Sequence, residues 1–443
     1  MAAESAGTLA AAEMGFGGLP FSAESHRRHL ERTLGPRPAG YEMPAGIVAV
    51  TEEIGSAFGR PVNPASHTEV LDAFRREGIE VQSTRKHILQ EIDHPAVPLL
   101  LRHRDLAKLF STNGWHWLDT WVHGNRFRPV YVPGAVVSGR WASRGGGALQ
   151  IPKALRSSVV SDPGWTFVVA DAGQLEPRIL AAMSGDPRMV AAAGEDDLYA
   201  PVAATAFAGD RAKAKVAVLG VLYGATSGDS RSLLAVLRKS FPDAVEFVER
   251  AAKAGERGEV VHSWLGRACP PAPPGFQSGP DVRARGRFTR NFVVQATAAE
   301  WALVLLATLR TRLSGTAAEL VLFVHDEVVV HCPRADADRV AGVVGDAAEE
   351  VVLAVASPQV VVHVDQRPVP VHAGVGDRRT AVGGRLQVSR PLGGGVHAVD
   401  ADREERIAAG CDEPGDTVAP GDRPAGARCA HEVRTRGGEA WSQ

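Results

Sequence analysis

In LVLFVHDEVVVHC, Leu320–Cys332, two apolar runs flank a short polar turn. This pattern predicts two strands, Glu319–Val324 and Val328–Cys332, joined at His325–Glu327. The two carboxylates of this turn therefore lie where buried strands end, at a point that is rigidly held and reachable from solvent. A polar hairpin turn without a chemical role is typical of the same pattern, so this stretch alone leaves the function open.

A second carboxylate follows another apolar run, in VVADAGQLEPR, Val168–Arg178. Thr166–Ala170 predicts a buried strand that ends at Asp171. Two aspartates at the tips of neighbouring strands, here Asp171 and Asp326, could hold two Mg²⁺ ions, because Mg²⁺ prefers hard oxygen ligands. The structural alternative is that Asp171 and Gln174 form the N-cap and N3 pair of a helix.

One helix face carries residues at intervals of four: Arg211, Lys215, Leu219 and Tyr223. An arginine fork and a lysine one turn apart, near a helix start where the dipole favours anions, suit a triphosphate. Surface cations on an amphipathic helix are the alternative. Gly220 and Gly224 favour the first interpretation, since glycines in a helix indicate the close approach of another group.

The remaining segments predict an α+β fold whose sheet is assembled from distant parts of the chain. Residues 1–60 are interpreted as a connector with one helix near 22–34. Ser66 opens a capping box for a helix that stops at Gly78, and a helix over 95–110 places Arg104 and Lys108 on one face. Further helices are expected over 198–253 and 291–313. Residues 378–443 lack periodicity and are predicted to be a disordered tail.

The composition is that of a soluble protein with a formal net charge of −2 over 443 residues, so DNA binding would depend on local basic patches. The four cysteines show no metal-ligand spacing, which favours reduced thiols in the cytoplasm. No secretory signal is evident, and no apolar run approaches the roughly 20 residues that span a bilayer.

Five blocks in order resemble the polymerase motifs of family A DNA polymerases, over roughly residues 63–364. VADAGQLEPRILAAMSGD resembles the first motif, RAKAKVAVLGVLYG the fingers-helix motif, and VHDE matches the third motif. SGRWAS followed by ALQIP, and RFTRNFVVQATAAE, resemble two further blocks of the family. One short motif is weak, but five in the correct order are specific.

The resemblance implies a metal and catalytic centre at the matched positions. Asp171 and Asp326 would bind two Mg²⁺ ions, and the Ala172 carbonyl could add a ligand. Glu327 would support the metal site. Lys215 would protonate the pyrophosphate leaving group.

The resemblance also implies binding sites for the incoming dNTP and for primer-template DNA. Arg211 and Lys215 would grip the triphosphate, and Glu176 would crowd the sugar 2′ carbon. Tyr223 would stack near the templating base, while Gln174 and Leu219 belong to the same nucleotide site. The DNA-binding residues would be Arg140, Arg287, Asn291, Gln295 and His325.

The implied architecture is a right-hand polymerase with a helical thumb, an antiparallel palm sheet and helical fingers. The expected domains are a connector (1–62), thumb and entry to the palm (63–160), palm (161–197), fingers (198–286), palm (287–377) and tail (378–443). The expected function is template-directed DNA synthesis by a monomer without a proofreading domain of its own and without membrane contact.

Several positions depart from the family pattern and keep a second hypothesis open, that of a catalytically weak or inactive DNA-binding protein with the polymerase fold. Val218 and Leu219 replace Asn and an aromatic residue, Pro177 interrupts the first motif, and Tyr199 stands where His is usual. A divergent branch of the family in GC-rich bacteria, often described as bifunctional 3′–5′ exonuclease/DNA polymerase, shares several of these changes.

Overall fold

The computed structural model describes residues 2–224, 230–276, 279–355, 362–367 and 385–387. Contacts divide the chain into two units, Met1–Arg390 and Pro391–Gln443. The second unit lies outside the described residues, as does most of the predicted tail over 378–443. All that follows concerns the first unit.

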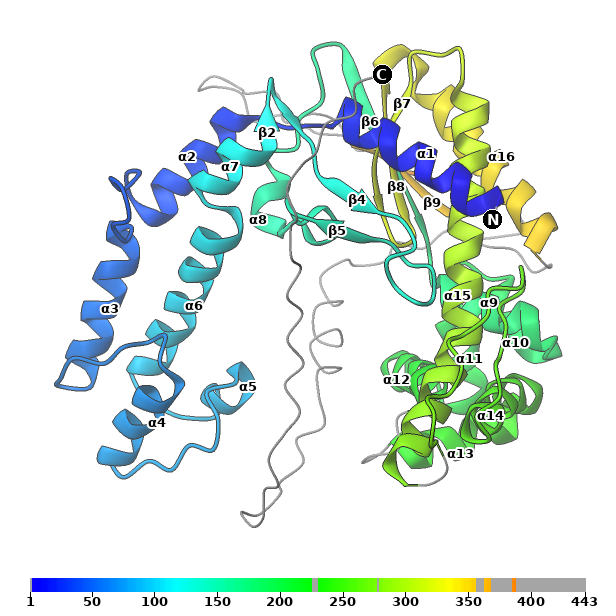
Figure 1. The fold of residues 1–443 in the computed structure, drawn as a ribbon, viewed down its shortest axis with the longest axis horizontal. Helices are drawn as coiled ribbons and strands as arrows, with labels where there is room; N and C mark the ends of the chain where they lie inside the picture. The colour runs from blue at the N-terminus through cyan, green and yellow to red at the C-terminus, as the bar shows by residue number, and fades with distance from the viewer. Residues whose placement is uncertain (1, 225–229, 277–278, 356–361, 368–384, 388–443) are drawn as a thin grey trace, which may run out of the picture. The chain divides into compact units, whose positions relative to one another are not determined.

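A five-stranded antiparallel sheet is built from segments far apart in sequence (Figure 1), in the order β10-β9-β6-β8-β7. Its strands are β6 (Trp165–Ala172), β7 (Glu319–Val324), β8 (Glu327–Pro333), β9 (Val362–Arg367) and β10 (Arg385–Gln387). β8 has three consecutive buried valines, Val328–Val330, and β6 buries Phe167, Val168 and Ala170, which suits central strands with both faces covered. The strands predicted around Asp171 and Asp326 are thereby confirmed, and the chain mixes helix and sheet as expected.

The helix α16 (Ala337–Val355) lies against β6, β8 and β9, and the long helix α15 (Pro280–Leu313) packs against α16. Phe292 and Trp301 of α15 are almost fully buried in the main hydrophobic core. The helix predicted from residue 291 begins eleven residues earlier, because Pro280 is well suited to a first helical position.

The expectation that no apolar stretch is long enough to span a bilayer is wrong. Within the described part of the chain, α15 is long and apolar enough to cross a membrane by length and composition. However, 78% of its apolar window is buried inside the molecule. Its hydrophobicity is therefore that of a core helix enclosed by protein.

Most of the segment between β6 and residue 256 is helical, and the helices expected over 198–253 are confirmed. The helices of this segment are α9 (Leu175–Ser184), α10 (Pro187–Ala193), α11 (Tyr199–Ala206), α12 (Arg211–Tyr223), α13 (Ser230–Ser240) and α14 (Pro242–Glu256). Pro177 does not break α9, because it lies in the first turn, where its missing N–H would have no helical partner.

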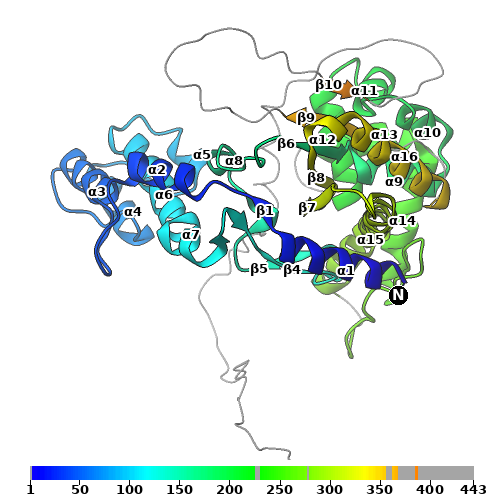
Figure 2. The same cartoon turned by 90° about the horizontal axis from the view of Figure 1, so that it is seen from above.

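The N-terminal segment is not the connector with one helix that the sequence predicted. It contains α1 (Ala2–Gly17), the expected α2 (Ala23–Leu34) capped by Ser22, and α3 (Ala45–Ala57). α1 packs on α15 and β7 (Figure 2) and buries Met14 in the main core. The sequence does not predict this helix because α1 is mostly alanine and glycine, and its few large apolar side chains do not form a distinct stripe.

A second hydrophobic cluster joins α2 and α3 to α4 (His67–Arg76) and α6 (Ala96–Asn113). The Ser66 hydroxyl accepts the Glu69 N–H at 3.3 Å, which confirms the predicted N-cap. Gly78 follows the helix end at φ 80°. The short elements nearby are α5 (Lys86–Leu89) and α7 (Trp115–Trp121).

Short strands connect this cluster to the main sheet region. β1 (Leu19–Pro20), β3 (Arg126–Phe127) and β2 (Val122–His123) form one small sheet, and β4 (Val130–Val132) pairs with β5 (Ala142–Arg144). The stretch 134–147, predicted to be irregular, holds only β5 as regular structure. The 3₁₀ helices η1 (Ala148–Gln150) and η2 (Arg334–Asp336) and the helix α8 (Lys153–Arg156) complete the described elements.

Candidate functional site

Strand pairing brings the two predicted aspartates to the same end of two neighbouring inner strands, β6 and β8. Asp171, the exposed seventh residue of β6, lies opposite Glu327, the first residue of β8. The Ala172 N–H donates a hydrogen bond to the Asp326 carbonyl at 3.0 Å. His325 precedes Asp326 in the β7–β8 turn with φ 57°, a backbone conformation that non-glycine residues rarely adopt. Residues separated by more than 150 positions in the sequence are thus neighbours.

Burial, together with the nearby Glu176 and Glu327, raises the pKa of Asp326 to about 6, and Arg140 opposes this rise. The charged form of this carboxylate has too little positive charge around it, and a bound divalent cation would supply that charge. Within the ranges described, no three His, Cys, Asp or Glu side chains come together as a metal-binding group. Two aspartates and the backbone carbonyl of Ala172 are hard oxygen donors, so this donor set fits Mg²⁺.

Glu176 connects three segments of the site. Its side chain forms an ion pair with Arg140, and its Oε2 accepts a hydrogen bond from the Tyr223 hydroxyl at 2.8 Å. Glu176 is 8% exposed, so both contacts are shielded from solvent. Burial and the nearby Arg140 also lower the pKa of His325, which keeps its imidazole neutral at pH 7.

The helix α12 presents the predicted cationic face. Its N-terminus is capped by Asp210, whose side chain accepts the Lys213 N–H at 3.0 Å. Arg211 and Lys215 follow on one face, with Leu219 partly buried and Tyr223 36% exposed. The opposite face packs into the core through Ala214, Ala217, Val218, Val221 and Leu222. Arg211, Lys215, Leu219 and Tyr223 therefore lie on the side of α12 away from its core-packed residues, as their spacing predicts.

Asp197 is a site residue that the sequence did not reveal. Its carboxylate accepts two hydrogen bonds from Arg211, at 2.6 and 3.2 Å, and one from the Gln174 amide at 3.0 Å. Gln174 also accepts the Leu198 N–H at 2.8 Å. The Arg211 guanidinium lies 5.5 Å from the Tyr199 ring centroid, within cation–π range. The acidic run before α11 carries no periodic signal that could have singled out Asp197.

The helix-capping alternative for Asp171 is wrong. Asp171 belongs to β6, and the N-cap of α9 is Gln174, in the left-handed region at φ 57°. The buried Arg178 fixes this turn by donating to the carbonyls of Gly173, Ala193, Glu195 and Asp196. Burial lowers the pKa of Arg178 to about 10, so the guanidinium stays charged.

A cavity of about 240 Å³ lies beside Tyr223 and contains the three predicted DNA-contact residues of α15. Asn291 Oδ1 and the hydroxyl of Ser138 are both buried and have no hydrogen-bond partner within the described residues. Such groups are costly unless a ligand or water satisfies them, so the cavity is suited to a polar ligand. Its lining comprises Val136, Val137, Ser138, Tyr223, Arg287, Phe288, Asn291, Phe292 and Gln295.

Comparison with known proteins shows the family of this chain. The profile of DNA polymerase family A matches residues 41–368. The thermostable DNA polymerase I of Thermus caldophilus is 28% identical over 357 residues, covering 70% of this chain and 42% of that protein. The DNA polymerase I of Chloroflexus aurantiacus is 26% identical, covering 70% of this chain and 38% of that protein. The chain thus spans less than half the length of these relatives.

A solved structure shares the fold. It is the POL domain of Pol1 from M. smegmatis in complex with DNA primer-template and dNTP, with a TM-score of 0.70 and 20% sequence identity. The match covers 82% of this chain and 69% of that one. With a family profile that matches most of its 443 residues, the chain belongs to DNA polymerase family A.

Proposed function

We propose that the chain is a template-directed DNA polymerase that adds dNTPs to a primer 3′-OH by two-metal nucleotidyl transfer and releases pyrophosphate. The observation that carries this proposal is the pairing of β6 with β8, which brings Asp171 next to Asp326 and Glu327. Membership of DNA polymerase family A supports the same chemistry.

Asp171, Asp326 and the Ala172 carbonyl would hold two Mg²⁺ ions. When bound, such ions lower the pKa of the primer hydroxyl and neutralise charge on the triphosphate and the departing pyrophosphate. Glu327, opposite Asp171 in the strand register, would keep the site acidic and orient its ligands.

The α12 face would hold the incoming dNTP. Arg211, oriented by Asp197, would contact the triphosphate, and Lys215 one turn further would donate a proton to the pyrophosphate. Glu176 is held by Arg140 and by Tyr223, so its carboxylate would keep a fixed position against the sugar 2′ carbon. Leu219 and Gln174 would complete the nucleotide site.

Primer-template DNA would bind beside this site. Arg287, Asn291 and Gln295 line the cavity and offer donors and acceptors that suit the minor groove, whose acceptors are similar for all correct base pairs. Arg140 and His325 would contact the primer end. The related Pol1 domain was solved with primer-template and dNTP, which supports these partners.

The right-hand arrangement is part of the proposal. The thumb would comprise 63–160, the palm 161–197 and 287–377, and the fingers 198–286. The exposed Lys108 of α6 would contribute salt-sensitive phosphate contacts, whereas the Arg104 guanidinium already donates to the Thr84 carbonyl.

Primer extension with Mg²⁺ and dNTPs tests the proposal by comparing the wild type with Asp326→Ala. The variant should lose activity by at least about a hundredfold, because a metal ligand is removed. It should remain folded, since burial already disfavours the charged form of this carboxylate. Asp346→Ala, which removes an exposed carboxylate from α16, should extend normally.

If the wild type binds a primed template but adds no nucleotide with Mg²⁺ or Mn²⁺, the catalytic proposal is wrong. The second hypothesis, a DNA-binding protein with the polymerase fold, then replaces it. Equal activity of wild type and Asp326→Ala would instead show that synthesis does not depend on this site.

A further inference from the structure

The loop between β4 and β5 carries Arg140 but has few internal contacts to hold it in place. Its backbone hydrogen bonds join the Gly139 N–H to the Val136 carbonyl at 2.7 Å, the Val136 N–H to the Arg140 carbonyl at 3.1 Å and the Ala135 N–H to the Val132 carbonyl at 3.4 Å. Val137 in the middle of the loop is 47% exposed. The position of Arg140 relative to Glu176 must therefore depend on contacts from outside the loop.

Arg267 supplies one such contact. Its guanidinium lies directly against Gly139, where a Cβ atom would meet Nε at 2.9 Å and Cζ at 3.0 Å. Gly139 also has φ 88°, so glycine is needed here for its conformation as well as for space. Any larger residue at this position would displace the guanidinium or the loop.

The backbone around Arg267 is itself fixed to α15. Ser263 donates to Glu300 Oε1 at 2.6 Å, and the Leu265 N–H donates to Glu300 Oε2 at 3.0 Å. The Arg267 N–H in turn donates to the Ser263 hydroxyl at 2.8 Å. Glu300 is 5% exposed, so these charge-assisted bonds are shielded from water.

Glu4 of α1 holds the other side of the guanidinium. It forms an ion pair with Arg267 in which the side chains are 32% and 23% exposed. Its Oε2 also lies 3.4 Å from the Cβ position of Gly134, at the start of the same loop. Glu4 therefore contacts both Arg267 and the loop.

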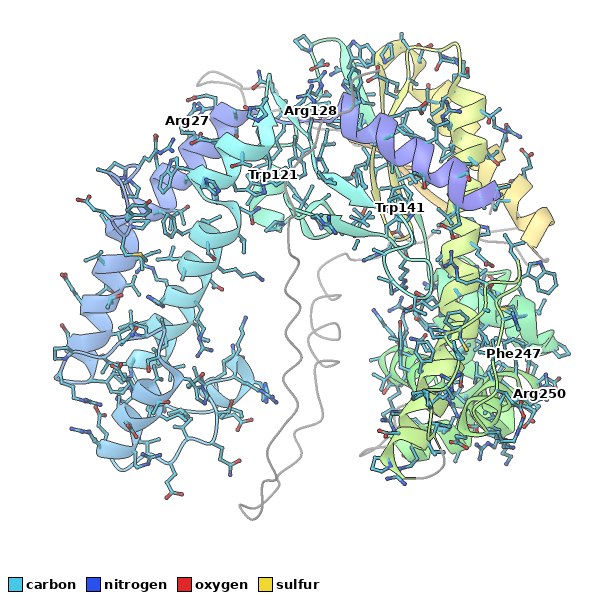
Figure 3. All side chains as sticks on the ribbon, in the orientation of Figure 1. Arg27, Trp121, Arg128, Trp141, Phe247 and Arg250 are labelled. Carbon is cyan, nitrogen blue, oxygen red and sulfur yellow. The ribbon has the colours of Figure 1, made fainter. Side chains whose placement is uncertain are left out.

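The helix that carries Glu4 also contacts the residue after Arg140. Gly7 of α1 leaves room for Leu303 and Trp141. Trp141, labelled in Figure 3, packs edge-to-face on Phe323 of β7 at a centroid distance of 4.8 Å. The end of the loop is thus held between α1 and the sheet.

We propose that Glu4 and Arg267 are positioning residues, whose ion pair holds the β4–β5 loop so that Arg140 meets Glu176 at the candidate site. This positioning role rests on the proposed polymerase function only where it predicts a change in activity. Glu4 and Arg267 meet the loop at Gly134 and Gly139, so their effect on Glu176 would pass through the loop and Arg140.

The chain offers a matched control for this ion pair. Glu13, on the same helix α1, pairs with Arg310 of α15 at 2.6 and 2.7 Å. That pair joins α1 directly to α15 and lies away from the contacts that Glu4 makes with Arg267 and the β4–β5 loop. Glu4→Gln and Glu13→Gln each remove one carboxylate charge from α1, so only the former should disturb the loop.

The first measurement is hydrogen exchange at the amides of Val136 and Gly139, which requires no enzymatic activity. Glu4→Gln should raise their exchange rates about tenfold, because the loop opens more often, and Glu13→Gln should leave them within about twofold. Similar exchange rates in both variants would overturn the proposal, whether or not the protein is a polymerase.

The second measurement is single-nucleotide incorporation. Glu4→Gln should lower kcat/KM for the dNTP about fivefold, and Glu4→Asp, which keeps the charge, should restore part of it. In an Arg140→Gln background the same change should cost less than about twofold, because both act through one residue. An equal loss in both backgrounds would show that Glu4 acts by another route, and wild type without activity would refute only the proposed function.

Discussion

At the scale of single residues, Glu176 is the centre of the candidate site. It is the common partner of Arg140 and Tyr223, which come from the β4–β5 loop and from α12. A carboxylate with two fixed partners loses little further freedom when a ligand binds, so it can act as a rigid steric boundary. This is the property that discrimination between deoxyribose and ribose requires.

Replacing Glu176 with alanine should relax sugar selection. The 2′ side of the site would gain space, so the ratio of rNTP to dNTP incorporation should rise at least about tenfold. The measurement is kcat/KM for each nucleotide on the same primed template. Tyr223→Phe keeps the carboxylate and removes one hydrogen bond, and it should change the ratio far less. An unchanged ratio in Glu176→Ala would contradict the assigned role.

At the scale of secondary-structure elements, the buried Asp186 side chain accepts hydrogen bonds from the first turns of two helices, α10 and α14. Asp186 Oδ1 accepts the N–H groups of Arg188 and Met189 at 3.1 and 3.0 Å, which caps α10. Its Oδ2 accepts the N–H groups of Asp243 and Ala244 at 3.1 and 3.4 Å, in the first turn of α14. The side chain therefore satisfies donors that both helices would otherwise leave unpaired.

Asp186→Ala should destabilise the protein by about 2–4 kcal/mol, because two helix starts lose their cap and buried N–H groups lose their acceptor. Chemical denaturation gives the free energy of unfolding. Asp210→Ala, which removes the exposed cap of α12, should cost less. A loss at Asp186 no larger than at Asp210 would show that the two helix starts are satisfied in another way.

At the scale of the whole molecule, α1 belongs to the main hydrophobic core. Ala10, Ala11 and Met14 of this helix are buried in the same cluster as Trp301 and Phe323. A segment far from α15 in sequence thus completes the packing around it. The same helix carries Glu4, so the core also fixes a residue that we propose to position Arg140.

Met14→Ala should therefore lower the free energy of unfolding by about 2–4 kcal/mol, the range for truncating a large buried side chain. Leu9 lies on the same helix and is 46% exposed, so Leu9→Ala should change it by no more than about 0.5 kcal/mol. Thermal or chemical unfolding distinguishes the two. Equal, small effects would mean that α1 is not part of the folded core in solution.

Local sequence patterns predict the central strands, the cationic face of α12 and the positions of the matched candidate residues. Runs of β-branched residues around Asp171 and Asp326, and the four-residue spacing from Arg211 to Tyr223, are local patterns that propensity and periodicity express directly. Short capping motifs such as that at Ser66 are also local, since donor and acceptor are three residues apart.

Which distant residues meet depends on tertiary packing. The contact of Asp197 with Arg211 and Gln174, the burial of Asp326 and the packing of α1 leave no periodic trace in the sequence. Each depends on strand register and helix packing between segments that are far apart along the chain. Burial and hydrogen-bond partnership are properties of this packing, and they set the pKa of Asp326 and the contacts of Arg140.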